Sequence, residues 1–178
     1  LKTLEISNAE SLENLDRLIG CNSLEDISIG ESYFHENYSN QLIENIDGLK
    51  GLNKLKNVDL SKFNSLKNID GFEGCPALES LSIQSDSLEN IDGLKNLKAL
   101  DRITLNVENL KNVDGLAGCE NLESCLINSQ YGDQICGNLE NLNGLKGINK
   151  IKELDIPASS ILINLDGLAG MDGLRKIN

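Results

Sequence analysis

Hydrophobic residues recur along this chain at steps of three that close with a single step of two. The segment Ser87 to Asn109, SLENIDGLKNLKALDRITLNVEN, shows the pattern clearly. Steps of three do not hold one stripe on an α-helix, because three residues turn only about 300°. The closing step of two is the period of a β-strand. The frame returns about every 22 residues, which is the signature of a repeat protein. In this segment the apolar positions are Leu88, Ile91, Leu94, Leu97, Leu100, Ile103 and Leu105.

Seven full coils follow an incomplete one at the start of the chain. Each coil leaves an apolar edge that it cannot bury alone, so the coils should stack. The pattern predicts one parallel sheet, with strands near residues 4–6, 27–29, 58–60, 81–83, 103–105, 125–127 and 154–156. Antiparallel pairing of consecutive coils would contradict it. The full coils open at Leu12, Ile43, Leu66, Leu88, Leu110, Leu139 and Leu162.

The frame LxxIxxLxxLxxLxxIxL of residues 88–105 resembles the leucine-rich repeats, most closely the short 22-residue class seen in internalins. Its Asp-Gly-Leu element is also similar to that of bacterial receptor-L-like domains. The resemblance implies a leucine-rich-repeat solenoid of the α/β class: a right-handed coil with one parallel β-sheet and short helical or 3-10 turns on the opposite side. Because both ends stop within a coil, we expect residues 1–178 to form a single array that is part of a longer one.

Every full coil carries asparagine two residues after its opening apolar residue. A side-chain amide at one turn of stacked coils can bond backbone groups that the turn leaves unpaired. We therefore predict a structural ladder rather than a ligand site. Leucine-rich repeats usually place such an asparagine just after the strand, where this chain has Phe63, Asp86, Glu108 and Ser159. The predicted ladder is Asn14, Asn45, Asn68, Asn90, Asn112, Asn141 and Asn164.

Asp-Gly or Asn-Gly follows in six of the seven coils, as at Asp92-Gly93. Glycine tolerates a positive φ and the preceding side chain can cap a helical turn, so such a turn should begin here. A row of carboxylates could instead bind Ca²⁺, but one carboxylate per coil falls short of six to eight converging oxygens. We predict caps and no metal site. The first full coil has Asp16-Arg17 and could turn differently.

Four of the five cysteines stand where other coils have core aliphatic residues: Cys21, Cys75 and Cys119 in one repeat position and Cys125 in a strand. We expect Cys21, Cys75 and Cys119 to be buried and reduced. Their spacing lacks CxxC pairs, which argues against zinc, and the odd count argues against a disulfide framework. These thiols favour a cytoplasmic location, with the cell surface or secretion as the alternative.

The net charge of −12 argues against nucleic acid as a partner, since phosphate binding needs clustered Lys and Arg. No run reaches the roughly 18 apolar residues of a membrane span, so membrane insertion is not expected. Catalysis has little support, because His35 is the single histidine and neither a phosphate-binding glycine loop nor a GxSxG nucleophile elbow is present. We expect no enzyme activity and no cofactor.

Two surfaces could bind a partner. The exposed strand face is polar, with Arg102 as its one typical hot-spot residue and Leu126 as its apolar one. The other surface is a pair of insertions after the second and sixth strands, Gly30 to Gln41 and Asn128 to Gly137, which should emerge along the same edge. Aromatic residues on loops of a rigid scaffold are typical of contact sites, although they could instead cover the solenoid edge. The candidates there are Tyr33, Phe34, His35, Tyr38 and Tyr131.

The sequence thus predicts a monomeric, non-catalytic protein–protein interaction module with a protein partner of unknown identity. Two alternatives stay open. One is a bacterial cell-surface adhesin or receptor-like domain that binds a host protein or glycan. The other is a structural spacer in a longer repeat array.

Overall fold

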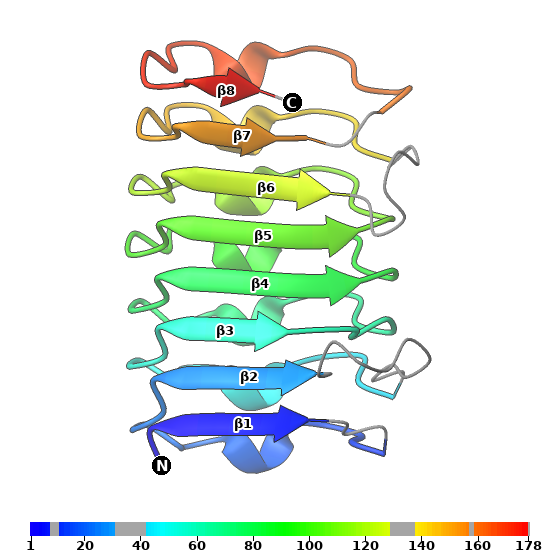
Figure 1. Ribbon diagram of the computed structural model, residues 1–178, viewed down its shortest axis with the longest axis vertical. Helices are drawn as coiled ribbons and strands as arrows, with labels where there is room; N and C mark the ends of the chain where they lie inside the picture. The colour runs from blue at the N-terminus through cyan, green and yellow to red at the C-terminus, as the bar shows by residue number, and fades with distance from the viewer. Residues whose placement is uncertain (8–10, 31–41, 129–137, 157–158, 178) are drawn as a thin grey trace.

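The computed structural model describes residues 1–7, 11–30, 42–128, 138–156 and 159–177. Within these ranges the strands form one sheet, stacked in chain order with every neighbouring pair parallel (Figure 1). The predicted parallel sheet is therefore confirmed, and a short eighth strand extends it. The strands are β1 (Thr3–Ser7), β2 (Asp26–Gly30), β3 (Asn57–Leu60), β4 (Ser80–Ser85), β5 (Arg102–Val107), β6 (Ser124–Asn128), β7 (Glu153–Asp155) and β8 (Lys176–Ile177).

A single 3-10 turn lies behind the sheet in each coil, and neighbouring turns pack on one another (Figure 1). Each begins at the Asp or Asn of the predicted element, so the expected helical turns are present. The first coil, despite its Asp16-Arg17, forms the same turn as the others. The turns are η1 (Asp16–Leu18), η2 (Asp47–Leu49), η3 (Asp70–Phe72), η4 (Asp92–Leu94), η5 (Asp114–Leu116), η6 (Asn143–Leu145) and η7 (Asp166–Leu168).

The apolar positions of the repeat form one continuous core between the sheet and the turns. In the coil that opens at Leu88, all seven predicted positions from Leu88 to Leu105 are buried, and the most accessible, Leu97, is only 5% exposed. Complete burial of one such side chain stabilises the fold by about 1.5–3 kcal/mol. The steps of three place residues on successive short sides of the coil, and the final step of two places a strand's alternate residues inward.

The glycine of the Asp-Gly element is required for a reason that differs from the prediction. A Cβ on Gly115 would lie 1.8 Å from the backbone oxygen of Ile91 in the preceding coil, and the other five equivalent glycines have the same contact at 1.8–2.1 Å. These glycines are not among the residues with positive φ. A positive φ occurs instead three residues later, for example at Gly118 and Gly147. Asn96 adopts a positive φ at the equivalent position of its own coil. Close backbone approach, and not a positive φ, therefore selects this glycine.

The predicted cap also has a different donor–acceptor arrangement. Each of these turns begins at an aspartate whose preceding N-cap residue, an aliphatic one such as Ile46 or Val113, supplies no side-chain capping hydrogen bond. Instead, Oδ1 of the asparagine two residues earlier accepts the backbone N–H of that turn residue at 3.0–3.3 Å in all seven full coils. The asparagine row thus satisfies a backbone donor that the turn leaves unpaired.

Three core cysteines, Cys75, Cys119 and Cys125, are fully buried, whereas Cys21 is only partly buried. The burial predicted for Cys21 is wrong, because this residue lies at the N-terminal end of the stack. All four thiols are free. The thiol of Cys75 donates to the Leu49 oxygen at 3.3 Å and that of Cys119 to the Leu94 oxygen at 3.2 Å. Burial raises the pKa of Cys119 to about 11 and, with the neighbouring Cys119, that of Cys125 to about 12.

Candidate binding surface

The outward-facing side chains of the sheet form straight columns, because the parallel register repeats at every strand pair. The columns alternate with the two core columns, as the strand period requires. One outward column contains Thr3, Asp26, Asn57, Ser80, Arg102, Ser124, Glu153 and Lys176, and the next contains Glu5, Ser28, Asp59, Ser82, Thr104, Leu126 and Asp155. A partner lying across the sheet would contact side chains from both columns.

The half of this face over β1 to β4 carries a shallow, acidic hollow of about 320 Å³. Glu5, Asp26 and Asp59 line it together with small hydroxyl side chains, and none of the described residues that line it is basic. Two of the carboxylates are held in place: Asp26 accepts a hydrogen bond from the Asn57 side-chain amide at 2.7 Å, and Asp59 accepts one from the Ser61 hydroxyl at 3.1 Å. The short side chains beneath leave the carboxylates accessible to a partner.

The half over β5 to β8 has a different charge pattern. A second hollow of about 290 Å³ lies where these strands begin, and its charged lining has both signs. The predicted Arg102 is exposed and lies in this hollow, away from the acidic one. Leu126 is half-buried in the column between Thr104 and Asp155. The residues that line the second hollow are Asp101, Arg102, Glu123, Ser124, Lys152, Glu153, Arg175 and Lys176.

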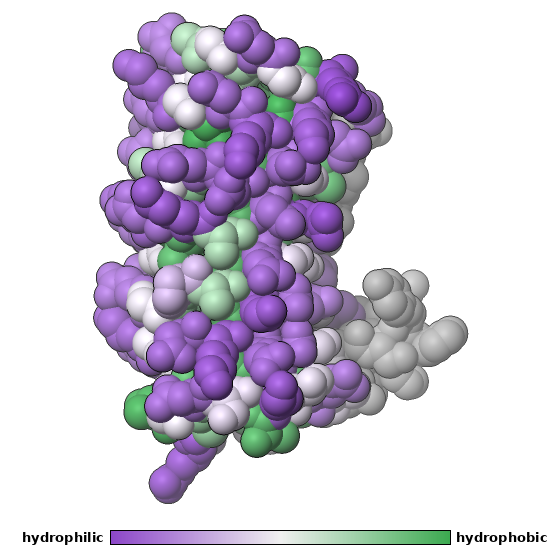
Figure 2. All heavy atoms as spheres, turned by 90° about the vertical axis from the view of Figure 1, so that its left-hand side faces the viewer, coloured by the Kyte–Doolittle hydropathy of each residue, from purple (hydrophilic) through white to green (hydrophobic). Residues whose placement is uncertain are grey.

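Ion pairs join neighbouring coils at the edge where the strands begin. Lys2 pairs with Glu25 at 2.8 Å and Lys56 with Glu79 at 3.7 Å. The hydrogen bond from Lys2 and its charge lower the pKa of Glu25. Figure 2 shows that hydrophilic side chains cover most of this edge. Such exposed pairs contribute little to stability, but they balance charge along the edge.

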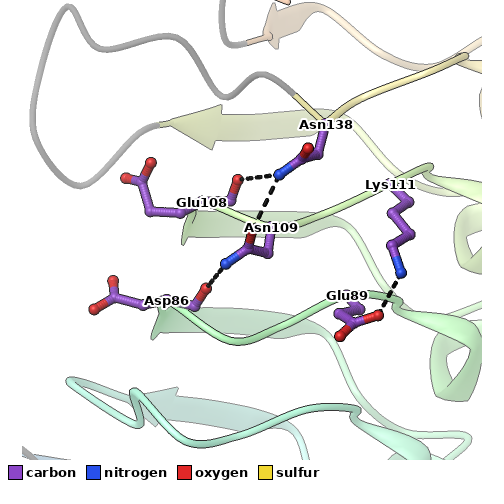
Figure 3. Close-up of polar contacts among 6 residues, drawn as sticks. All are labelled: Asp86, Glu89, Glu108, Asn109, Lys111 and Asn138. Atoms are coloured by element: carbon purple, nitrogen blue, oxygen red, sulfur yellow. Dashed lines mark hydrogen bonds and ion pairs between the residues drawn. The ribbon is translucent and has the colours of Figure 1, made fainter.

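Side-chain amides bridge three coils at the opposite edge, directly after the strands (Figure 3). The Asn109 amide donates to the Asp86 backbone oxygen at 2.6 Å. The Asn138 amide donates to the Asn109 side-chain oxygen at 3.0 Å and to the Glu108 backbone oxygen at 3.4 Å. Our sequence reasoning missed Asn109 and Asn138. The available signal was an asparagine directly before the opening residue of two adjacent coils.

One carboxylate at this edge is partly withdrawn from solvent. Burial raises the pKa of Asp86, and the charge of Glu108 raises it further. Its Oδ1 atom has no hydrogen-bond partner within the described part of the chain. A second row of exposed ion pairs lies just beyond. Lys111 pairs with Glu89 there (Figure 3), and Lys67 pairs with Glu44. The hydrogen bond from Lys111, together with its charge, lowers the pKa of Glu89.

The two insertions start at this same edge. β2 ends at Gly30 and β6 at Asn128, and Ile29 and Ile127 belong to one column of the sheet. The first described residue after the first insertion is Leu42, which is 51% exposed. The first one after the second insertion is Asn138, which belongs to the amide bridge. The predicted contact residues lie outside the described residues, and their role stays a prediction; they are Tyr33, Phe34, His35, Tyr38 and Tyr131.

The described residues contain no group of three or more His, Cys, Asp or Glu side chains that could hold a metal ion. Among the same residues, no helix is long and apolar enough to cross a membrane.

Comparison with protein-family models gives no match, and comparison with curated proteins gives none. Among solved structures, internalin C2 from Listeria monocytogenes superposes with a TM-score of 0.51 at 19% identity, over all of this chain and 76% of that one. A second internalin from that bacterium, inlF, gives a TM-score of 0.56 at 16% identity, over all of this chain and 61% of that one. The chain is therefore a leucine-rich-repeat solenoid. Within that class its fold is similar to that of the internalins.

Proposed function

We propose that the chain is a non-catalytic protein-interaction module that binds a protein partner across the strand face and along the edge where the insertions begin. The observation that carries this proposal is the acidic hollow over β1 to β4, whose described lining includes Glu5, Asp26 and Asp59 and contains no basic residue. Lys or Arg side chains of a partner complement such a surface, which guides association and fixes its orientation. The internalin-like leucine-rich-repeat fold, typically a non-enzymatic scaffold, supports this reading.

The geometry of the edge supports a single discontinuous contact site. β2 and β6 are four strands apart in the sheet, which corresponds to about 19 Å at the usual spacing. A standard interface of about 800 Å² per partner spans this distance. In the proposed complex Tyr33, Phe34, His35, Tyr38 and Tyr131 supply the aromatic contacts, and the acidic hollow beside β2 supplies the charge. Arg102 and Leu126 extend the same strand face.

The experiment begins with capture of partners by the immobilised chain, identification by mass spectrometry and measurement of Kd with the purified partner. Two variants then shorten the insertions in register. One keeps Gly30, because a Cβ there would lie 2.6 Å from that of Ser61, and replaces residues 31–42 with the sequence of residues 85–87. The other replaces residues 128–138 with the sequence of residues 106–109. Each should keep the circular dichroism spectrum of the parent and weaken binding at least tenfold, since aromatic hot spots contribute about 2 kcal/mol or more.

A charge series separates the hollow from the loops. Asp26→Asn with Asp59→Asn should weaken binding about tenfold and slow association most at low salt. The matched control, Asp47→Asn with Asp166→Asn, removes the same charge from exposed turns behind the sheet and should leave Kd unchanged. If the shortened and charge-neutralised variants bound the partner with the affinity of the parent chain, the proposed site would be refuted. A spacer would yield no saturable partner, whereas an adhesin would select a cell-surface protein or glycan.

A further inference from the structure

One of the turns behind the sheet carries a chemically labile pair of residues. Asn143 and Gly144 open η6, and Asn143 is the only asparagine of the sequence that a glycine follows. The other six turns have aspartate at this position. Asparagine is among the residues that limit the chemical stability of proteins, and a following glycine leaves the next backbone nitrogen unshielded by a side chain. Spontaneous deamidation is the reaction to consider at this pair.

Deamidation of Asn143 would begin at the backbone nitrogen of Gly144. This nitrogen loses its proton to a solvent base and attacks Cγ of Asn143. The new N–Cγ bond forms, the Cγ–Nδ2 bond breaks, and Nδ2 takes a proton from water and leaves as ammonia. The product is a five-membered cyclic imide. Water then opens one of the two imide carbonyls, which gives either aspartate or isoaspartate, in which the main chain runs through Cβ.

The reacting amide is accessible, and the turn does not use the attacking nitrogen. Asn143 is exposed, whereas Gly144 is buried. One backbone hydrogen bond of η6 runs from the Leu145 N–H to the Leu142 oxygen at 2.9 Å. The other runs from the Lys146 N–H to the Asn143 oxygen at 3.1 Å. Neither bond involves the Gly144 N–H, so the nucleophile itself is not held by the turn.

The conformation of η6 nevertheless opposes ring closure. The imide ring places the Gly144 nitrogen and Cβ of Asn143 nearly eclipsed about the Cα–C bond, whereas a ψ of about −20 to −30° in a 3-10 turn holds them apart. Rotating this bond swings the Asn143 oxygen away from the Lys146 N–H and moves Gly144, where a Cβ would lie only 1.8 Å from the Val113 oxygen. Oδ1 of Asn141 holds the turn as well, since it accepts the Asn143 N–H at 3.0 Å. Ring closure therefore requires η6 to open.

The two products differ in how they fit the stack. Five other turns, η2, η3, η4, η5 and η7, already begin with Asp-Gly, and their glycines meet the preceding coil as closely as Gly144 does. Aspartate at position 143 therefore needs no rearrangement. Isoaspartate adds one main-chain atom before Gly144, which shifts this glycine against the Val113 carbonyl and misaligns the hydrogen bond from the Lys146 N–H.

We propose that Asn143 is a site of spontaneous deamidation that is gated by local opening of η6, and that the folded solenoid accepts the aspartate product and not the isoaspartate product. The closed turn suppresses the reaction, and the rate follows the fraction of time that the turn is open. Conversion to aspartate adds one negative charge behind the sheet and leaves the outward columns of the strands unchanged. This inference is therefore independent of the proposed interaction surface.

The test follows deamidation at Asn143 by mass spectrometry of digested samples that have aged in mildly alkaline buffer. The folded chain is compared with the same chain in denaturing urea and with a peptide of residues 138–149, which contains the pair without the stack. The folded chain should deamidate at least about tenfold more slowly than either reference, because local opening is a minor state. Liquid chromatography separates the aspartate and isoaspartate forms of the digested peptide.

Two variants separate opening of η6 from unfolding of the whole chain. Asn141→Ala removes the acceptor of the Asn143 N–H and should speed deamidation of the folded chain by about fivefold or more. Asn90→Ala makes the matched change at η4, where Asn90 accepts the Asp92 N–H at 3.3 Å, and should leave the rate at Asn143 unchanged. In denaturing urea both variants should deamidate as fast as the parent chain.

The products are tested separately. Asn143→Asp reproduces the aspartate form and should keep the urea midpoint of the parent chain to within about 0.3 M. In an aged sample, a brief protease pulse at intermediate urea should digest the isoaspartate chains first, because chains that are unfolded at that urea concentration are the ones cut.

Four results would overturn the proposal. Equal rates in the folded chain and the peptide would show that the turn is no gate, and no reaction in the peptide or in urea would show that the pair is not labile. Equal acceleration by Asn141→Ala and Asn90→Ala would assign control to unfolding of the whole chain. A midpoint that Asn143→Asp lowers by about 1 M would show that the turn rejects aspartate.

Discussion

Replacing Gly144 by alanine should destabilise the solenoid far more than replacing Gly147, three residues away in the same coil. A Cβ at Gly144 would lie 1.8 Å from the Val113 oxygen and 2.4 Å from its carbonyl carbon. A Cβ at Gly147 would meet nothing within 4 Å, and only its φ of +83° opposes a side chain. The pair therefore separates close backbone approach from backbone conformation.

The magnitudes follow from these contacts. To bring the Gly144→Ala contact from 1.8 Å to 3.0 Å, the two coils must separate locally by at least 1.2 Å. A gap of 0.5–1 Å already forfeits a quarter to a half of the dispersion energy between facing atoms, and overpacking alone costs about 1–3 kcal/mol. The separation also strains the hydrogen bond from the Glu140 N–H to the Lys111 oxygen. We expect a loss of about 3–5 kcal/mol for Gly144→Ala and about 1–2 kcal/mol for Gly147→Ala.

The assay is urea unfolding followed by far-ultraviolet circular dichroism, with the midpoint as the compared quantity. At an m-value of about 2–3 kcal/mol per molar urea, Gly144→Ala should lower the midpoint by about 1–2 M and Gly147→Ala by less than about 1 M. Gly147→Asn is a further control, because Asn96 adopts this conformation in another coil. Equal shifts for Gly144→Ala and Gly147→Ala would refute the reasoning that the coils rest on each other's carbonyls.

Two further predictions concern the core thiols and the asparagine row. The pKa values of Cys119 and Cys125 are raised from 9.0 to about 11 and about 12, so the thiols ionise first in the unfolded chain and stability is lost as the pH rises above 9. The free energy of unfolding, measured with urea between pH 8 and 10.5, should fall by an amount approaching about 1.4 kcal/mol per pH unit for each thiol. This fall should be smaller in the double variant Cys119→Ala with Cys125→Ala. An equal pH slope in the parent chain and the double variant would contradict the prediction. Asn112→Ala removes the acceptor of the Asp114 N–H and should lower stability by about 1 kcal/mol, whereas Asn112→Asp keeps a side-chain oxygen and should lose less. Calorimetry of the pair measures both, and equal losses would contradict the capping role.

The fold could be predicted from the apolar pattern because every coil repeats the same choice of inward positions. The period of three and the closing step of two located the strands to within about two residues, as at 103–105 against Arg102–Val107. The Asp-Gly and Asn-Gly elements also located six of the seven 3-10 turns, whereas the first turn, at Asp16–Leu18, lacks the glycine that marks the others. A single sequence cannot show how near two backbones lie, so it suggested a positive φ for Gly115 where contact with the Ile91 carbonyl is decisive.

The polar surface was less predictable for a related reason. Contacts between coils join residues about 22 positions apart, and nothing local marks them. The amide bridge from Asn138 through Asn109 to Asp86 depends on where the chain turns after each strand, because this sets which side chains of neighbouring coils meet. The acidic hollow depends on register, which brings Glu5, Asp26 and Asp59 from three strands to one side of the sheet. Arg102 and Leu126 were correctly assigned to the exposed face of the strands, although Leu126 is half-buried there.

The most direct test of the proposed interaction surface is carboxylate footprinting of the complex with a captured partner. Exposed Asp and Glu are coupled to a neutral amine by a carbodiimide, with and without saturating partner, and the modification at each residue is measured by mass spectrometry. Our account predicts protection of Glu5, Asp26 and Asp59, with Asp47 and Asp166 on the turns behind the sheet modified equally in both samples. Protection of Asp47 and Asp166 with full modification of the hollow would contradict it.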